Sequence, residues 1–400
     1  MAMIKLSGED SLRLNVLLAN QPQAIRIDES RLRVHGLSER GEACITLNPT
    51  ARPEAYVRAV RELISGHILG SPGGYPTYLR RWTRMGQMRD ESLAQLLLLG
   101  EPEAVVAAAC SPGLTDELGR RAWWAMEDAE NARRMLGNPA IVQGRMGPVL
   151  AAYLVEFLPF ETEAEKMTES VRLVLQPGLI EEQRCLDIWH KSARKPAYAL
   201  GFLQARPDTL PDPAPARADF GEYAPRLEGL ICAGNPWAWG LVRVLSAPGQ
   251  TWLKTVAQVL AKPPTQDLTL TTLQMVAGYF APLRPEGEPD LTLVDLIAEA
   301  EACVDPAQAP DPLRACLAAV PSLRDDLVAL RLLSGLGYGV LRPFLRDTTA
   351  SGSLMRRKLD PVLGPISLRL EGLRGKAGPC AHGPSRQCQR PSPAPPGRWP

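Results

Sequence analysis

The sequence has few of the features that usually reveal an activity. It is 400 residues long and contains four histidines, none of them in the His-x-x-x-His or His-Glu-x-x-His spacing of metal sites. Its eight cysteines form no Cys-x-x-Cys pair, which argues against a disulfide framework or an iron–sulfur cluster. No Walker loop and no Gly-x-Ser-x-Gly elbow occurs. The motifs therefore give no positive sign of catalysis, of a metal or of another cofactor.

Long hydrophobic runs and an excess of one charge are also missing. No apolar run approaches the ~20 residues that a membrane helix needs, and the longest, 149–160 and 328–345, are broken by charged residues and proline. Glu9 and Asp10 stand where the apolar core of a signal peptide would lie. The 45 basic residues nearly balance the 44 acidic ones, which argues against a surface built wholly for nucleic acid or anionic lipid. We expect a soluble cytoplasmic protein without membrane contact.

Proline is abundant, with 38 residues, or about twice the usual share of ~5%. Each proline inside a helix removes a hydrogen bond and clashes with the preceding turn, so long uninterrupted helices are not expected. The hydrophobic share of 45% and the charged share of 22% are those of a globular protein. The length predicts two to three domains.

The only clear β pattern lies near the N-terminus. Ser7 followed by Asp10 resembles a capping box and predicts a helix over 8–19. Alternating polar and apolar residues then predict short strands at 24–28, 31–34 and 43–47, with a turn over 36–41 between the last two. Three such strands in sequence predict a small meander.

From residue 53 onward the hydrophobic spacing is helical. The segment 112–117 resembles 177–182, a tryptophan follows in both, and a similar helix pair begins near 147, which predicts a unit of roughly 32 residues. The fold is therefore expected to be mainly α, either irregular or an α-solenoid of helix pairs. The expected regions are 1–50 with the helix and meander, 51–204 helical, 205–220 a proline-rich linker or ordered loop, 221–372 helical, and 373–400 a disordered basic tail.

Two neighbouring segments are candidates for binding. The amides of Gly73 and Gly74 could form an anion-binding nest, although we prefer to interpret the glycines as a simple turn between helices. The segment 75–89 holds four arginines, three aromatic residues and no acid. Its cluster could be a solvated helix face, a contact with a partner protein, or an RNA contact that combines phosphate binding with base stacking. This cluster consists of Arg80, Arg81, Trp82 and Arg84.

Cysteine chemistry offers an alternative to binding. A thiolate can carry sulfur as a persulfide. Most of the cysteines lie within apolar helical patterns and are expected in the core, whereas Cys303 is near a predicted helix end and more open. We therefore name Cys303 as the candidate thiol. In the tail, Cys380, His382 and Cys388 are one ligand short of a zinc cage.

Four strings carry a resemblance to a known family. They are LNVLLAN at 14–20, VHGLSERGEA at 34–43, GHILGSPGGYP at 66–76 and RRAWWAM at 120–126. Together they resemble the DsrS family of the dissimilatory sulfur-oxidation gene set, over about residues 8–372. The resemblance implies an accessory or regulatory protein of sulfur oxidation and carries no catalytic residue with it. Its expected partners are proteins of the sulfur-oxidation system or their transcript, and the expected function is non-catalytic, with sulfur transfer by a cysteine persulfide as the alternative.

Overall fold

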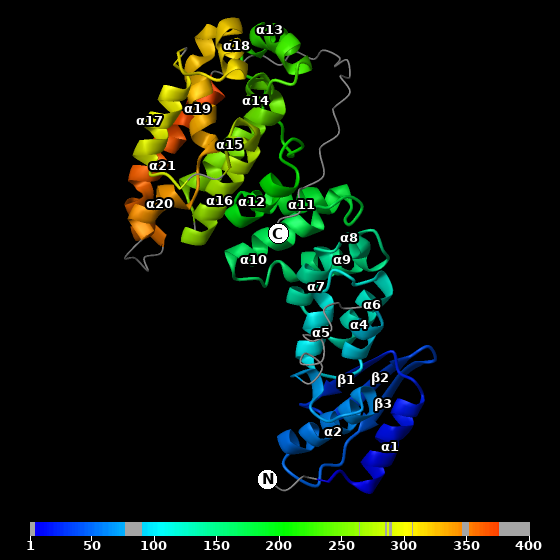
Figure 1. Cartoon of the computed structure of the whole chain (residues 1–400). Helices are drawn as coiled ribbons and strands as arrows, with labels where there is room; N and C mark the ends of the chain where they lie inside the picture. Colours follow the sequence, from blue (N-terminus) through cyan, green and yellow to red (C-terminus); the bar gives the residue numbers. More distant parts are fainter. Residues whose placement is uncertain are drawn as a thin grey trace. The chain divides into compact units, whose positions relative to one another are not determined.

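The computed structural model describes residues 5–76, 90–263, 265–284, 286–287, 290–305, 307–345 and 352–375. The chain is mainly helical, with one three-stranded antiparallel sheet near the N-terminus (Figure 1), which confirms the predicted fold class. It divides into two compact units, and each is described by itself. Unit 1 contains the chain up to Pro207 with Ala261–Thr272 and 352–356, and unit 2 contains the rest. The expected tail lies outside the described residues from 376 onward.

Unit 1 begins with a helix and the sheet, and its described residues after the sheet form helices joined by short connections. Its elements are α1 (Gly8–Ala19), β1 (Ala24–Asp28), β2 (Arg33–Ser38), β3 (Gly41–Thr46), α2 (Pro53–Leu69), α4 (Asp90–Leu96), α5 (Pro102–Ala109), α6 (Asp116–Ala125), α7 (Ala129–Leu136), α8 (Pro139–Val142), α9 (Met146–Phe157), α10 (Ala164–Val174), α11 (Glu182–Ser192) and α12 (Pro196–Ala205).

The core under the sheet joins α1, α2 and the strands. Leu14 and Leu17 of α1, Ile25 and Val34 of the sheet, and Tyr56 of α2 belong to one buried cluster. The strands pair in the order β1-β2-β3, and residues of one face alternate with those of the other. The apolar face therefore packs on the helices, and the other face carries polar residues.

The position of β2 corrects the sequence-based expectation. The expected strand at 31–34 is instead Arg33–Ser38, and Gly36 lies inside it and not in a turn. A Cβ atom at Gly36 would lie 2.7 Å from Leu17 Cδ1, which is closer than packing allows. Gly36 is thus required by the close approach of α1 to the sheet, and a glycine in a strand can mark such an approach.

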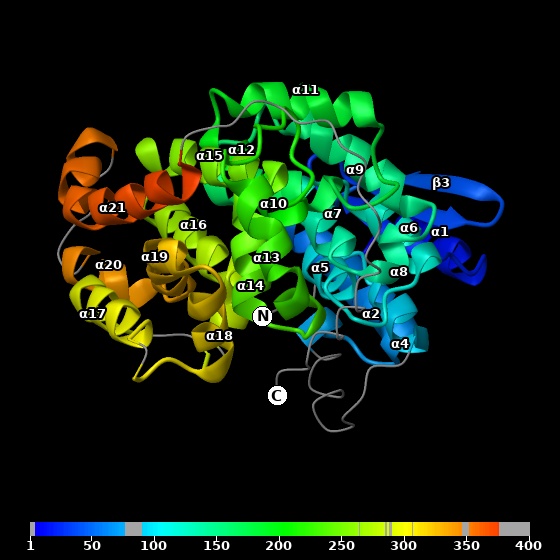
Figure 2. The ribbon, with the colours of Figure 1, turned by 90° about the horizontal axis from the view of Figure 1, so that it is seen from above.

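After the sheet, unit 1 is built from successive helix pairs: α4 with α5, α6 with α7, α9 with α10, and α11 with α12. The second helices make a continuous series of contacts, α5 with α7, α7 with α10, and α10 with α12. Figure 2 shows α7, α9 and α10 side by side. A close approach occurs at Gly201 of α12, where an added Cβ would lie 2.6 Å from the Cβ of Val171. Such stacking is typical of an α-solenoid.

The helices of unit 2 are α13 (Phe220–Cys232), α14 (Pro236–Leu245), α15 (Ala247–Ala261), α16 (Gln266–Tyr279), α17 (Leu293–Cys303), α18 (Asp311–Ala319), α19 (Arg324–Ser334), α20 (Tyr338–Leu345) and α21 (Gly352–Arg374), with 3₁₀ turns at Ala281–Leu283 and Pro321–Leu323. Residue 261 of α15, residues 266–272 of α16 and residues 352–356 of α21 belong to unit 1. Trp252 is fully buried and stacks on Tyr279 with ring centroids 3.8 Å apart. The Arg243 guanidinium covers the Tyr279 ring at 3.5 Å and pairs with Asp208.

No single described helix is long and apolar enough to cross a membrane. The segments Pro321–Ser334 and Tyr338–Phe344 reach the required length and composition only as a pair, and they meet at an angle of 75°.

The proline-rich segment before α13 is anchored by Arg217. Its guanidinium makes two hydrogen bonds to each of two carboxylates, Asp219 and Asp326, and a further one of 3.4 Å to the carbonyl oxygen of Leu373. Arg217 is only 7% exposed. Although burial acts against its charge, the two aspartates raise the pKa of Arg217 above its usual value. One side chain therefore holds this segment, α19 and the end of α21 together.

We predict that Arg217→Met destabilises unit 2 strongly. The change leaves Asp326 and Asp219 without their counter-charge, and breaking a buried ion pair in this way costs about 3–5 kcal/mol. Urea unfolding followed by circular dichroism measures the loss. The control is Arg226→Met, which removes the solvent-exposed ion pair with Glu222 and is expected to cost less than about 1 kcal/mol. Equal effects of the two variants would contradict the role of Arg217 as an anchor.

Candidate functional site

A row of aromatic side chains lies on the surface of unit 1. The ring of Trp123 on α6 meets Tyr153 of α9 edge-on with centroids 4.8 Å apart, Tyr153 stacks on Phe157 at 6.1 Å, and Phe157 lies 6.4 Å from Phe160. Phe160 is 75% exposed, and Val149, one helical turn before Tyr153, is 49% exposed. We call these five residues the aromatic face.

The helix spacing explains why these side chains are together. Val149, Tyr153 and Phe157 are four residues apart and therefore share one side of α9. The adjoining side of α9, with Leu150 and Leu154, is buried, so Tyr153 and Phe157 lie at the edge of the core. Val149 and Ala152 are exposed on the same helix, although a surface helix normally has polar residues where it meets solvent.

A carboxylate fixes α9 against α6. Asp116, the first residue of α6, accepts hydrogen bonds from the backbone amides of Arg145 (3.0 Å) and Met146 (2.9 Å), where α9 begins. A negative charge at a helix N-terminus also stabilises the helix dipole. The relative placement of Trp123 and Tyr153 is therefore set by the scaffold before any partner binds.

Acidic residues adjoin the aromatic face. Burial, and after it the negative charges of Asp128 and Glu127, raise the pKa of Tyr153 above its usual value. Glu156 is exposed next to Phe157 on α9. Aromatic rings with carboxylates beside them attract cations, because an Arg or Lys side chain can lie over a ring face while its charge is paired.

The arginine cluster expected to bind a partner cannot be compared with this surface. Arg80, Arg81, Trp82 and Arg84 all fall in 77–89, outside the described residues. Their assignment as a contact surface stays a prediction.

The expected nest at Gly73 and Gly74 is described, and the amides of Gly74 and of the next residue, Tyr75, are engaged within the chain. Both glycines have positive φ angles, +120° and +55°. The amide of Gly74 donates to Ser65 Oγ at 2.8 Å, and the amide of Tyr75 donates to the Glu101 carboxylate at 3.2 and 3.3 Å. The anion held at this helix start is therefore the carboxylate of Glu101, which a free anion would have to displace.

Cys303 lies at the end of α17 and is half-buried. Burial raises the pKa of its thiol; the charge of Arg331 lowers it, and those of Glu299 and Glu286 raise it further. A sulfur carrier needs the opposite shift, because the thiolate is the nucleophile. The environment of Cys303 thus favours the protonated, unreactive form.

Within the part of the chain that the structure describes, no group of three or more His, Cys, Asp or Glu side chains is placed to hold a metal ion. Comparison of the chain with protein-family models, with curated proteins and with solved structures finds no match.

The aromatic face was not identified from the sequence. The signal was present, since Val149, Tyr153 and Phe157 repeat every four residues on a helix that is apolar on both sides. The contribution of Trp123 could not be found in this way, because it depends on how α6 packs against α9.

We predict that Cys303 reacts slowly with iodoacetamide. Its raised pKa leaves less thiolate at neutral pH than an exposed cysteine has, so alkylation should be about tenfold slower than at the exposed Cys232 of α13. Peptide mapping by mass spectrometry after timed labelling of the native protein measures both rates. Faster labelling of Cys303 than of Cys232 would restore Cys303 as a candidate carrier.

Proposed function

We propose that the chain is a non-catalytic accessory protein that binds a protein partner through the aromatic face. The observation that carries the proposal is the row of half-buried rings from Trp123 to Phe157, which ends at the exposed Phe160 and is presented by stacked helix pairs. Exposed aromatic residues supply most of the binding free energy at many protein interfaces.

The charges beside the aromatic face select the kind of partner. Glu127, Asp128 and Glu156 suit a basic segment of a protein, whose Arg or Lys side chains would lie over the rings. The same carboxylates repel the phosphates of RNA, whose binding depends on positive charge. A basic protein segment is therefore the occupant that we propose.

The biological setting is suggested by the strings that resemble the DsrS family. They support a partner among the proteins of the sulfur-oxidation system and a regulatory or accessory role there. The proposal for the aromatic face rests on its geometry alone, so it holds for any basic partner.

We predict that Phe160→Asp weakens partner binding without loss of fold. Phe160 is 75% exposed, so its replacement removes little packing, while an acidic residue at an interface aromatic is expected to cost about 2 kcal/mol or more, roughly thirtyfold in affinity. Tagged protein is recovered from cells grown on reduced sulfur compounds, bound proteins are identified, and the affinity of a purified partner is measured by calorimetry.

The matched control is Val294→Asp, which places the same charge at a position of equal exposure, 76%, in unit 2. The partner should be retained by this variant and by wild type, and bound more weakly by Phe160→Asp. Glu127→Lys should weaken binding of a basic partner. Recovery of RNA that is unaffected by Phe160→Asp and lost at high salt would instead favour the transcript as partner and the arginine cluster as its site.

A further inference from the structure

A thiol, an imidazole and a carboxylate meet on the polar face of the sheet. Cys44 of β3 lies directly opposite His35 of β2 in the strand register, with Sγ 3.9 Å from His35 Nε2. The other ring nitrogen, Nδ1, is 2.6 Å from Glu42 Oε1. Arg26 of β1 and the indole nitrogen of Trp124 also donate to the Glu42 carboxylate, at 3.3 and 3.2 Å.

Glu42 determines which nitrogen of His35 carries the proton. Burial acts to raise the pKa of Glu42, but the hydrogen bonds from Trp124 and His35 and the charge of Arg26 lower it on balance. An ionised carboxylate only accepts hydrogen bonds, so Nδ1 of His35 must be the donor. In neutral His35 the free lone pair is then on Nε2, which faces the thiol of Cys44.

The thiol is also accessible. Cys44 is exposed on β3, an outer strand of the sheet, and no core packing accounts for it. The order thiol, imidazole, carboxylate is the arrangement that activates nucleophiles in enzymes on unrelated folds.

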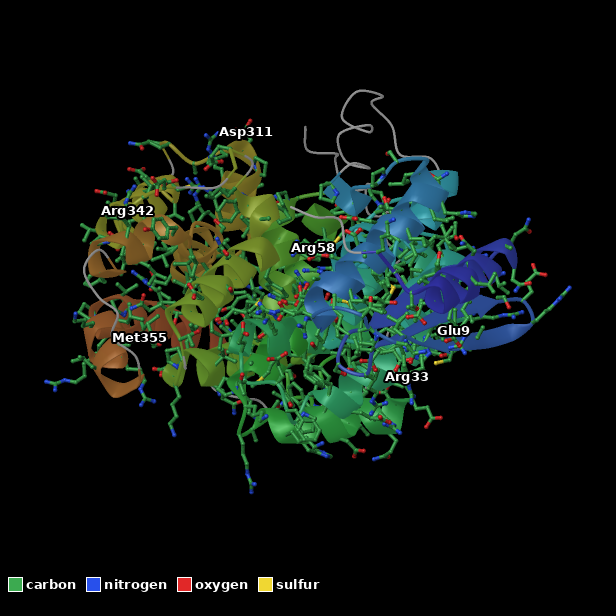
Figure 3. The ribbon with its side chains drawn as sticks, turned by 90° about the horizontal axis from the view of Figure 1, so that it is seen from below. Glu9, Arg33, Arg58, Asp311, Arg342 and Met355 are labelled. Atoms are coloured by element: carbon green, nitrogen blue, oxygen red, sulfur yellow. The ribbon has the colours of Figure 1, made fainter. Side chains whose placement is uncertain are left out.

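Beside His35 lies a cavity of about 470 Å³ with an excess of positive side chains. Arg33, labelled in Figure 3, begins β2 and is exposed there. Two of the three arginines in the lining are already paired: Arg31 lies 4.0 Å from the Asp28 carboxylate, and Arg26 bonds to Glu42. Glu101 accepts from the amide of Tyr75, and Arg33 makes no ion pair with a described residue. The charged and titratable residues of the lining are Arg26, Asp28, Arg31, Arg33, His35 and Glu101.

We propose that Cys44 is a site of thiol–disulfide exchange, with His35 as its proton acceptor and a small disulfide that carries carboxylates as its reagent. Arg33 binds a carboxylate of the reagent and brings the disulfide to the sheet face, where His35 lies between the cavity and Cys44. Exchange needs a thiolate and a proton carrier but no group to stabilise an oxyanion, in agreement with the groups present.

The step balances within the site. The proton of the Cys44 thiol moves to His35 Nε2, and the thiolate attacks one sulfur of the reagent. A bond forms between Cys44 Sγ and that sulfur while the disulfide bond of the reagent breaks. The leaving thiolate takes the proton from His35, so that one mixed disulfide and one free thiol result. The Cys44 thiolate supplies both electrons of the new bond, and the leaving sulfur keeps both electrons of the old one, so Cys44 is oxidised and the leaving half of the reagent is reduced.

The test uses the full chain and two aromatic disulfides of similar size, one with carboxylates and one without charge. Native protein is mixed with each reagent, release of the coloured thiol gives the rate, and peptide mapping gives the site. Cys44 should react about a hundredfold faster than Cys232, an exposed thiol on α13, and His35→Gln should remove most of that advantage. Arg33→Gln should slow only the carboxylated reagent, by about tenfold.

Glu42 acts by positioning His35, and this role is tested by a separate measurement of the His35 ring. Nitrogen-15 spectra of the four histidine rings report which nitrogen is protonated; wild type should show the proton of His35 on Nδ1, and Glu42→Gln should change this distribution. The proposal is overturned if Cys44 reacts no faster than Cys232, or if His35→Gln leaves the rate unchanged in protein that retains its circular dichroism spectrum. Equal slowing of both reagents by Arg33→Gln would overturn the preference for an anionic disulfide.

Discussion

The short length of the helices is the constraint on which the rest of the structure depends. Apart from α2 and α21, no described helix exceeds 15 residues. Isolated helices of that length are marginally stable in water, so their stability has to come from packing. Prolines account for much of the shortness, and several stand at the first helical position, where they fit best: Pro53, Pro102, Pro139, Pro196 and Pro236. The chain thus forms stacked pairs, each of which completes the core of its neighbour.

The rigid array explains how two different surfaces arise from adjacent residues. Trp123 and Trp124 follow one another on α6, and their side chains contact different parts of unit 1. Trp123 belongs to the aromatic face, whereas Trp124 donates to Glu42 on the sheet and stacks with Arg26. A single helix turn therefore contributes to both the proposed partner surface and the proposed thiol site.

Local signals in the sequence predicted the fold well, and long-range contacts account for what they missed. The meander and most helices follow from alternation, capping residues and proline positions, which act over a few residues. The misplaced β2 depended on Gly36 meeting Leu17 of another element. His35 and Cys44 were both visible, but only the strand register shows that they face each other. Arg217 and Asp326 are 109 residues apart, a distance at which no pattern of spacing connects them.

The contacts of Arg217 also determine how unit 2 responds to tension. This residue precedes α13 near the start of the unit, and Leu373, whose carbonyl it binds, lies near the end of α21. A force that pulls these two parts of the chain in opposite directions acts on the hydrogen bond from Arg217 to the Leu373 carbonyl, and the ion pairs with Asp219 and Asp326 hold Arg217 in place against it. The contacts of Arg217 therefore join the start and the end of unit 2. The force that they withstand falls where salt or protonation weakens the ion pairs that hold Arg217.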